Sequence, residues 1–241
     1  TPFMSCSAKL PIYGMITAAF FSDSSALVML AVYVLGIVVA ILSGLLLKKT
    51  LFTGNPVPFV MELPAYRIPN AQSVLLHMWE KAKDFLHRAF TIIFTATIVI
   101  WFLQSYDFSF HAVSDASESM LAGIGSLLSP IFAPLGFGDW RATSALITGV
   151  TAKESVVSTL SILTGAGSDA GLSAALMTMF TPVSAFAFLC FTVLYMPCVA
   201  AFAATRRELG SFWQALATVL FQTGVAYIVA FLVYQIGSVL L

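Results

Sequence analysis

The amino-acid sequence predicts an all-α fold, a polytopic helical membrane bundle with broken or re-entrant helices. Only 9% of the 241 residues are charged, against roughly a quarter in an ordinary soluble domain. Hydrophobic residues make up 59% of the chain, and the mean hydropathy is +0.96. Acidic and basic residues balance at 11 each, so the chain has no basic surface for a nucleic-acid partner. Long stretches carry no charge and approach or exceed the roughly 20 residues that span a bilayer as a helix: 24–47, 89–106, 119–138, 170–205 and 209–241.

The first element, residues 1–22, reads as a broken or half helix. Pro2, Lys9 and Pro11 interrupt an otherwise apolar run. Residues 23–49 then predict a full transmembrane helix, because they form an apolar run of sufficient length.

Small residues recur every four positions in this second element. Gly36, Ala40 and Gly44 have the spacing that lets membrane helices approach closely, and we interpret them as ordinary helix packing. Lys48 and Lys49 follow directly and indicate a cytoplasmic end.

Residues 50–89 predict a cytoplasmic loop followed by an amphipathic helix in the membrane interface. The loop is rich in proline, and Glu62 and Arg67 are its only charges. From Ala71 onward an apolar stripe faces a polar one. A surface metal site is geometrically feasible on the polar stripe, although a solvated face is the interpretation we favour. The side chains concerned are His77, Glu80, Asp84 and His87.

Residues 90–105 predict a transmembrane helix, and residues 106–118 predict an outer loop. No Lys or Arg occurs between Arg88 and Arg141, whereas acidic residues gather in the loop. These acidic residues are Asp107, Asp115 and Glu118.

Residues 119–208 predict a second unit of short and broken helices. The stretch 119–138 is apolar but carries Pro130, Pro134, Gly136 and Gly138, which suggests a short or re-entrant segment. The stretch 142–163 reads as one helix, and 174–205 reads as a long span broken near Pro197. Residues 209–241 predict a final transmembrane helix.

Lys153 and Glu154 are the most informative residues, because they stand in the middle of an apolar run. Each costs roughly 2.5–3.5 kcal/mol at the centre of a membrane helix and is seldom kept there without a function. On one continuous helix Thr148, Thr151, Ser155 and Ser158 would share a polar face with Glu154 at its edge and Lys153 opposite. Such a face is typical of a hydrophilic path. The alternative is that both charges pair with neighbouring helices and hold the bundle together.

Two similar segments, Pro2–Cys6 and Leu194–Cys198, form a second candidate feature. In each, an aromatic residue, a methionine and a cysteine stand beside a proline. Proline frees backbone carbonyls, and thiolate or thioether sulfur adds soft ligands, so the pair is suited to a metal such as Fe(II). Chance similarity, with the cysteines as small packing residues, stays open as the alternative. We interpret Cys190 as a packing residue.

Several motifs, in order along nearly the whole chain, resemble the membrane region of the FeoB family of bacterial ferrous iron transporters. They are Pro2-Phe3-Met4-Ser5-Cys6-Ser7-Ala8-Lys9-Leu10-Pro11, Phe59-Val60-Met61-Glu62-Leu63-Pro64-Ala65-Tyr66-Arg67, His77-Met78-Trp79-Glu80, Gly138-Asp139-Trp140-Arg141, Gly149-Val150-Thr151-Ala152-Lys153-Glu154-Ser155-Val156-Val157 and Tyr195-Met196-Pro197-Cys198-Val199-Ala200. The resemblance implies two gate-like repeats, the first ending within residues 1–22 and the second covering 119–208. It also implies an N-terminal GTPase domain, outside this chain, that binds GTP and Mg²⁺.

The function implied by this resemblance is transport of Fe²⁺ across the bacterial inner membrane into the cytoplasm, with Fe²⁺ as cargo and no permanently bound cofactor. The chain itself is then a transporter fragment and not an enzyme. Implied partners are the lipid bilayer, the G domain, small cytoplasmic accessory proteins and a second copy of the protein. The expected transport path consists of Cys6, Cys198, Glu154, Ser5, Met196, Pro197, Thr151 and Ser155. The expected structural or gating residues are Lys153, Lys9, Glu62 and Arg67.

Two other functions stay open. Gate-like repeats also resemble those of nucleoside carriers, so the solute could be organic, with Glu154 binding sugar hydroxyls and the cysteines packing. Alternatively, the chain carries no solute and anchors a signalling G domain in the membrane.

Overall fold

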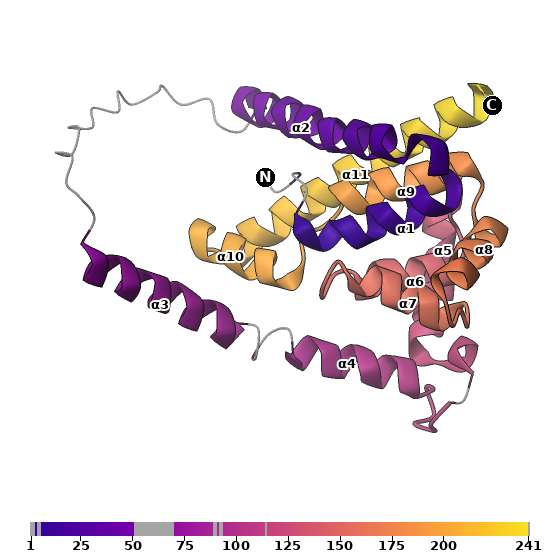
Figure 1. The fold of residues 1–241 in the computed structure, drawn as a ribbon, viewed down its shortest axis with the longest axis horizontal. Coiled ribbons are helices and arrows are strands. Elements are labelled where there is room, and N and C mark those ends of the chain that lie inside the picture. The colour runs from indigo at the N-terminus through magenta and orange to yellow at the C-terminus, as the bar shows by residue number, and fades with distance from the viewer. Residues whose placement is uncertain are drawn as a thin grey trace.

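The protein folds as an all-α membrane bundle, as the sequence predicts (Figure 1). The computed structural model describes Phe3 and residues 6–50, 70–88, 91, 94–113 and 115–240, apart from the side chains of residues 84, 85, 88, 169 and 240. Within these ranges the only β-pairing is an isolated bridge between Tyr106 and Ala112.

Three apolar helical segments in the described ranges are long enough to cross a bilayer. The first, Ser22–Thr50, contains α2 (Ser25–Thr50). The second, Pro182–Leu209, consists of α9 (Pro182–Leu194) and α10 (Val199–Leu209). The third, Phe212–Val239, lies within α11 (Phe212–Leu240). The second element and the C-terminal element thus form helices long enough for the predicted spans, and the helix predicted to break near Pro197 is interrupted there.

The first segment is a half helix. A 3₁₀ turn, η1 (Ser7–Lys9), leads into the 11-residue α1 (Leu10–Phe20). Pro11 lies in the first turn of α1, where a missing N–H costs nothing, so it starts the helix instead of breaking it. Buried residues of α1 join the hydrophobic core, and α1 lies beside α9 and α8 (Asp169–Met179).

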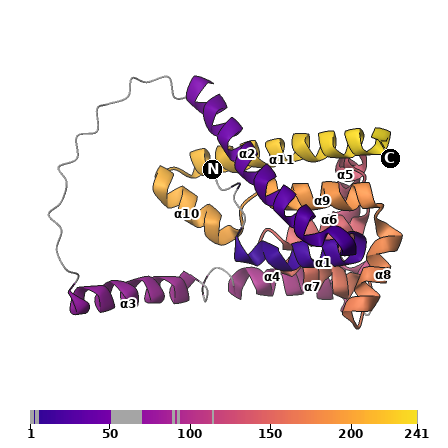
Figure 2. The same cartoon turned by 45° about the horizontal axis from the view of Figure 1, so that its top comes forward.

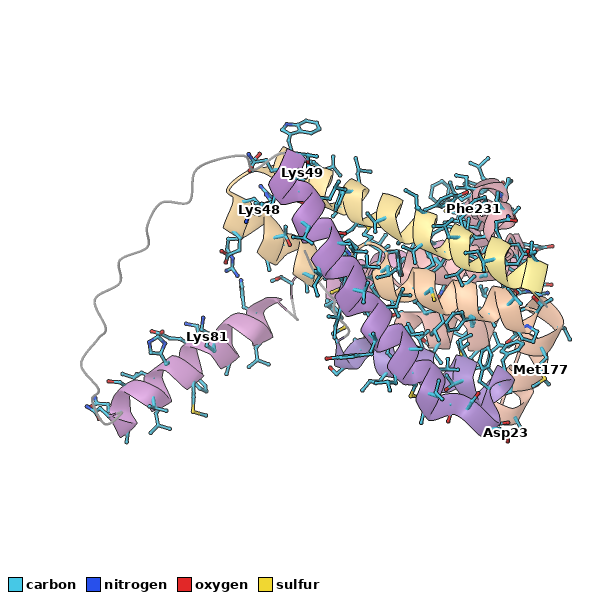
Figure 3. All side chains as sticks on the ribbon, turned by 90° about the horizontal axis from the view of Figure 1, so that it is seen from above. Asp23, Lys48, Lys49, Lys81, Met177 and Phe231 are labelled. Carbon is cyan, nitrogen blue, oxygen red and sulfur yellow. The ribbon has the colours of Figure 1, made fainter. Side chains whose placement is uncertain are left out.

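Only part of the small-residue stripe of α2 meets a neighbour. A side chain at Gly36 would begin 3.0 Å from the backbone oxygen of Phe3, so the glycine permits this close approach. No described atom lies within 4 Å of the equivalent point at Gly44. Figure 3 shows Lys48 and Lys49 at one end of α2 and Asp23 at the other, and the assignment of the lysine end to the cytoplasm stays a prediction.

The amphipathic helix α3 (Ala71–Arg88) stands apart from the bundle, followed by α4 (Phe94–Ser105) (Figure 1). Both its polar and its apolar residues are exposed, including Leu75 and Trp79. The loop after α4 is ordered by the carboxylate of Asp107, which accepts hydrogen bonds from the backbone N–H groups of Ser109 and His111.

The stretch 119–138 turns back on itself, as the prolines and glycines predict. Helix α5 (Met120–Phe132) and the 3₁₀ turn η5 (Ala133–Leu135) meet α6 (Trp140–Thr148) at an angle of 104°. Gly136 makes the corner with φ of +84°, and the ring of Tyr234 occupies the place a side chain would need.

Two expectations from the sequence are wrong. The stretch 142–163 is not one helix, because α6 ends at Thr148 and α7 (Ser155–Leu163) begins after a six-residue turn. The long span does not begin at Ala174, which belongs to α8. It begins at Pro182, where Thr181 and Ser184 cap each other's backbone in a capping box.

Candidate functional site

Two interrupted helices meet in the bundle, at residues 149–154 between α6 and α7 and at residues 195–198 between α9 and α10. We call this place the crossing. Three hydrogen bonds join its two sides. The Tyr195 hydroxyl donates to the Leu146 carbonyl (3.1 Å), Lys153 Nζ donates to the Met196 carbonyl (2.7 Å), and the Val199 N–H donates to the Val150 carbonyl (2.9 Å). Backbone groups that a continuous helix would satisfy are thus satisfied between the two breaks.

Gly149 allows the two sides to come this close. A side chain here would begin 2.5 Å from the Tyr195 hydroxyl and 2.5 Å from a methyl group of Val156. Real Cβ contacts are longer, so the residue at this turn must be glycine for Tyr195 to reach α6.

Pro197 explains why a lysine reaches the end of α9. In a continuous helix the Val193 carbonyl would accept from the N–H of residue 197, and proline has none. Lys9 Nζ donates to this carbonyl instead, at 2.6 Å, although Lys9 is 184 residues away in sequence. Lys9 therefore supplies the hydrogen bond that Pro197 removes from the helix.

Both lysines are buried at this site, Lys9 with 5% and Lys153 with 3% of its surface exposed. Lys153 Nζ also lies 3.2 Å from the centre of the Tyr195 ring, which favours a cation. Lys9 lies directly before α1, and Lys153 lies two residues before α7. The dipole at the start of a helix disfavours positive charge at both places. The carbonyls of the broken span are what hold the two ammonium groups there.

The two cysteines of the sequence motif belong to the same site. Each takes an extended conformation directly before a helical element, Cys6 before η1 and Cys198 before α10. Cys6 is exposed and Cys198 half-buried, and both lie near enough to Lys9 and Lys153 for a thiolate at either position to interact with the ammonium groups. Cys190 is fully buried in the core, as expected for a packing residue.

The other predicted path residues are placed less centrally. Glu154 lies beside Lys153 but is exposed, and Ser155 is half-buried at the first position of α7. The Thr151 hydroxyl donates to the Thr148 carbonyl within the turn (2.7 Å). The predicted polar helix face does not form, because the helix breaks, and the Thr148 hydroxyl pairs with that of Thr159 (2.9 Å).

Met196 and Pro197 lie in the break itself, half-buried and buried respectively. Ser5, Glu62 and Arg67 lie outside the described residues. Among the residues whose side chains are described, no three His, Cys, Asp or Glu groups come together in a way that could hold a metal ion. The ligand set of Cys6, Cys198 and Glu154 stays a prediction. On the polar face of α3, the described side chains include an exposed contact between His77 and Glu80 (3.9 Å).

Sequence reasoning missed two residues near this site. Tyr195 counted only as an aromatic in a motif, yet its hydroxyl links the two breaks. Gln222 carries no charge and so gives no signal of the kind that indicates Lys153, although an amide within the uncharged stretch 209–241 is also costly to bury. Gln222 is completely buried in α11.

Comparison with known proteins identifies relatives over nearly the whole chain. Residues 29–81 match the family model described as ferrous iron transport protein B C terminus, and residues 86–212 match the Gate model, described as nucleoside recognition. The chain is 43% identical over 237 residues to the Fe(2+) transporter FeoB of Staphylococcus aureus (strain MSSA476), covering 98% of this chain and 35% of that protein. It is 41% identical over 246 residues to the Fe(2+) transporter FeoB of Methanocaldococcus jannaschii, covering 99% of this chain and 36% of that protein.

A third relative, from Porphyromonas gingivalis, is named as a fusion of Fe(2+) transport protein A and Fe(2+) transporter FeoB. It is 38% identical over 284 residues, which cover 98% of this chain and 34% of the fusion. The chain thus spans about a third of the length of these relatives. No solved structure matches it. The long apolar helices and these relatives identify a multi-pass protein of the inner membrane. Because the Gate model covers more than half of the chain and both family models and the relatives agree, the chain belongs to the FeoB family and corresponds to its C-terminal membrane region.

Proposed function

We propose that this chain forms the membrane path by which Fe²⁺ enters the cytoplasm, driven in the complete protein by a GTP-binding domain. The observation that carries the proposal is the crossing, where two buried ammonium groups occupy carbonyls beside two cysteines. The names of the relatives, Fe(2+) transporter FeoB, point to the same ion.

The arrangement suits a closed path. A divalent cation and an ammonium group compete for the same carbonyl oxygens, and the positive charge of Lys9 and Lys153 repels Fe²⁺. Passage therefore requires the ammonium groups to leave the Val193 and Met196 carbonyls. These oxygens then join the thiolates of Cys6 and Cys198 as ligands, and Glu154 supplies a carboxylate at the exposed side of the turn. Several weak sites of this kind let an ion bind and leave again.

Partners of the complete protein would act on the parts that stand outside the bundle. Helix α3 carries exposed charges, including Lys81 (Figure 3), and offers the G domain or an accessory protein a surface to contact. The Porphyromonas gingivalis fusion supports an accessory partner of the transport protein A kind. A second copy of the protein is a further proposed partner.

Uptake of radioactive Fe²⁺ by cells that produce the complete protein tests this function. Replacing Cys6 or Cys198 with serine, or Glu154 with glutamine, should lower uptake while membrane insertion is unchanged, and Cys190→Ala is the matched control. Wild-type uptake in all three variants would overturn the assignment of the path. Purified protein in vesicles should carry Fe²⁺, and competition by nucleosides in place of divalent metals would show an organic solute.

The gating role of Lys153 has its own test. Lys153→Met frees the Met196 carbonyl and removes the repelling charge, so Fe²⁺ flux into vesicles should persist without GTP. Lys81→Met, on the exposed α3, is the control and should keep the dependence on GTP. Flux through Lys153→Met that requires GTP as the wild type does would exclude this lysine as the gate.

A further inference from the structure

The corner between α10 and α11 holds an open recess that the proposed path does not use. Its volume is about 440 Å³, and it is lined by α10 together with the glycine that follows this helix. The lining residues recur at intervals of three and four along the chain, which places them on one face of the helix. They are Val199, Phe202, Ala203, Arg206, Arg207 and Gly210.

Local contacts fix the shape of this corner. Gly210 ends α10 in the left-handed region, with φ of +66°, and α11 begins two residues later. The ring of Phe212 packs edge-on against the ring of Phe202, with 5.9 Å between their centres. The guanidinium group of Arg206 lies over the same Phe212 ring, 5.8 Å from its centre. The first residue of α11 thus positions one arginine beside the recess.

The two arginines of the recess are not neutralised by neighbouring side chains. Both are exposed, and neither guanidinium group forms an ion pair or a hydrogen bond with a described side chain. Glu208 follows them directly, but it does not line the recess and pairs with neither of them. Two positive charges therefore stand at one end of a recess whose other lining residues are uncharged, so a complementary ligand is negatively charged at that end.

The recess lies where two apolar spans end. The broken span ends at Leu209 and the last span begins at Phe212, so the corner is at the edge of the apolar part of the chain. Figure 2 shows this corner at the same end of the bundle as the last turn of α2, which carries Lys48 and Lys49. Trp213, beside the corner, is 75% exposed, as is typical of aromatic residues at the level of lipid headgroups. The recess therefore opens at headgroup level, on the side predicted to face the cytoplasm.

The lining changes from apolar to basic along α10. Val199 directly follows the break at 195–198, whereas Arg206 lies seven residues later, about 10 Å along the helix. The apolar end is therefore the deeper one in the membrane, and the basic end lies at the membrane surface. Free phosphate matches only the basic end. A phospholipid matches both ends, with its phosphate at the arginines and an acyl chain along Phe202 and Ala203.

We propose that the corner between α10 and α11 is a binding site for an anionic phospholipid of the inner leaflet. The guanidinium groups of Arg206 and Arg207 bind the lipid phosphate, a group that arginine recognises through paired hydrogen bonds, and the apolar face of α10 receives one acyl chain. Because α10 begins directly after Cys198, a lipid bound here holds the helix that follows the break. The site does not depend on which solute the protein carries.

Native mass spectrometry of the complete protein in detergent tests this site with defined lipids. Phosphatidylglycerol, which is anionic, should bind more tightly than zwitterionic phosphatidylcholine. In Arg206→Gln/Arg207→Gln the Kd for phosphatidylglycerol should rise by about 25-fold, because each basic residue at a membrane surface contributes a factor of about five. Lys48→Gln/Lys49→Gln is the matched control. It removes two charges at the same end of the bundle but outside the recess, and its Kd should stay at the wild-type value.

A second variant blocks the recess and keeps its charges. Ala203→Trp fills the apolar end and should also weaken the binding of phosphatidylglycerol, whereas Ala217→Trp, exposed on α11, should not. Wild-type affinity in the arginine variant would overturn the proposal. Glycerol phosphate, which has no acyl chain, should bind far more weakly than the lipid, and equal binding would overturn the lipid site in favour of a free anion. Wild-type affinity in Ala203→Trp would likewise overturn it, because the arginines would then act without the recess.

Discussion

The broken span and the two continuous spans differ in where they lie. The comparison uses the most apolar stretch of each segment. In the segment that contains α9 and α10, 61% of that stretch is buried, whereas the buried share is 17% in the segment that contains α2 and 22% in the segment within α11. A continuous helix satisfies its own backbone and can face lipid, whereas an interrupted one exposes N–H and C=O groups that lipid cannot satisfy. The protein therefore surrounds the interrupted helix with other helices, and the partners it supplies are the lysine, tyrosine and backbone groups of the crossing.

The largest expected effect of this difference is on packing. Leu189→Ala, in the buried α9, should lower the free energy of unfolding by about 2–5 kcal/mol through the cavity that it leaves. Leu42→Ala, on an exposed face of α2, should have little effect because lipid fills the space. Unfolding in mixed detergent micelles measures both. Equal losses would show that α2 is covered by protein.

The sequence predicted the long continuous helices and the proline break well, because both are local. The long uncharged run within α2, which ends at Leu47, specifies a span by its length, and Pro197 removes a hydrogen bond wherever it stands. The start of α9 also has a local signal in the sequence, since Thr181, Pro182 and Ser184 form a capping signature.

The break between α6 and α7 could not be predicted in the same way. Residues 149–154 contain no proline, and their pattern of apolar and polar residues fits a helix. What interrupts them is tertiary: the Val150 carbonyl pairs with Val199, and Tyr195 occupies the space beside Gly149. For the same reason the motif indicated Cys6 and Cys198, but not that Lys9 would reach the end of α9.

A second prediction concerns the closeness of the crossing. Gly149→Ala places a methyl group against Tyr195 and Val156 and should cost about 1–3 kcal/mol through overpacking. Gly224→Ala, in α11, meets nothing within 4 Å and should be neutral or slightly stabilising. Thermal unfolding in detergent compares the two. If Gly149→Ala matched Gly224→Ala, the two breaks would not be in contact.

A third prediction isolates one bond of the crossing. Tyr195→Phe removes the hydrogen bond to the Leu146 carbonyl and should lower the free energy of unfolding by about 1 kcal/mol. The same change should restore part of the stability lost in Gly149→Ala, because the hydroxyl is one of the atoms that clash. Tyr33→Phe, exposed on α2, is the control. Strictly additive effects in the double variant would argue against this contact.

The smallest expected effect compares two glycines within one span. Gly44→Ala should stabilise α2 by up to about 1 kcal/mol, which is the difference in helix propensity between the two residues. The new methyl group meets no described atom within 4 Å. Gly36→Ala should lose most of that gain, because the new methyl group meets the Phe3 backbone oxygen at 3.0 Å. The difference in unfolding temperature between the two variants is the measurement. Identical gains in unfolding temperature would show that the Phe3 backbone does not contact α2 at Gly36.

The four-residue break at 195–198 also gives its span an adjustable length. A straight helix of 28 residues, the length of each of the two C-terminal spans, is about 42 Å long, whereas the hydrocarbon core of a bilayer is about 30 Å thick. The continuous spans must accommodate this excess by tilting as whole rods, and α2 crosses the other helices obliquely (Figures 2 and 3). The interrupted span can instead change the angle between α9 and α10. The break that adapts the span to the thickness of the membrane therefore includes Cys198. The rate of transport should then depend on the acyl-chain length of the bilayer.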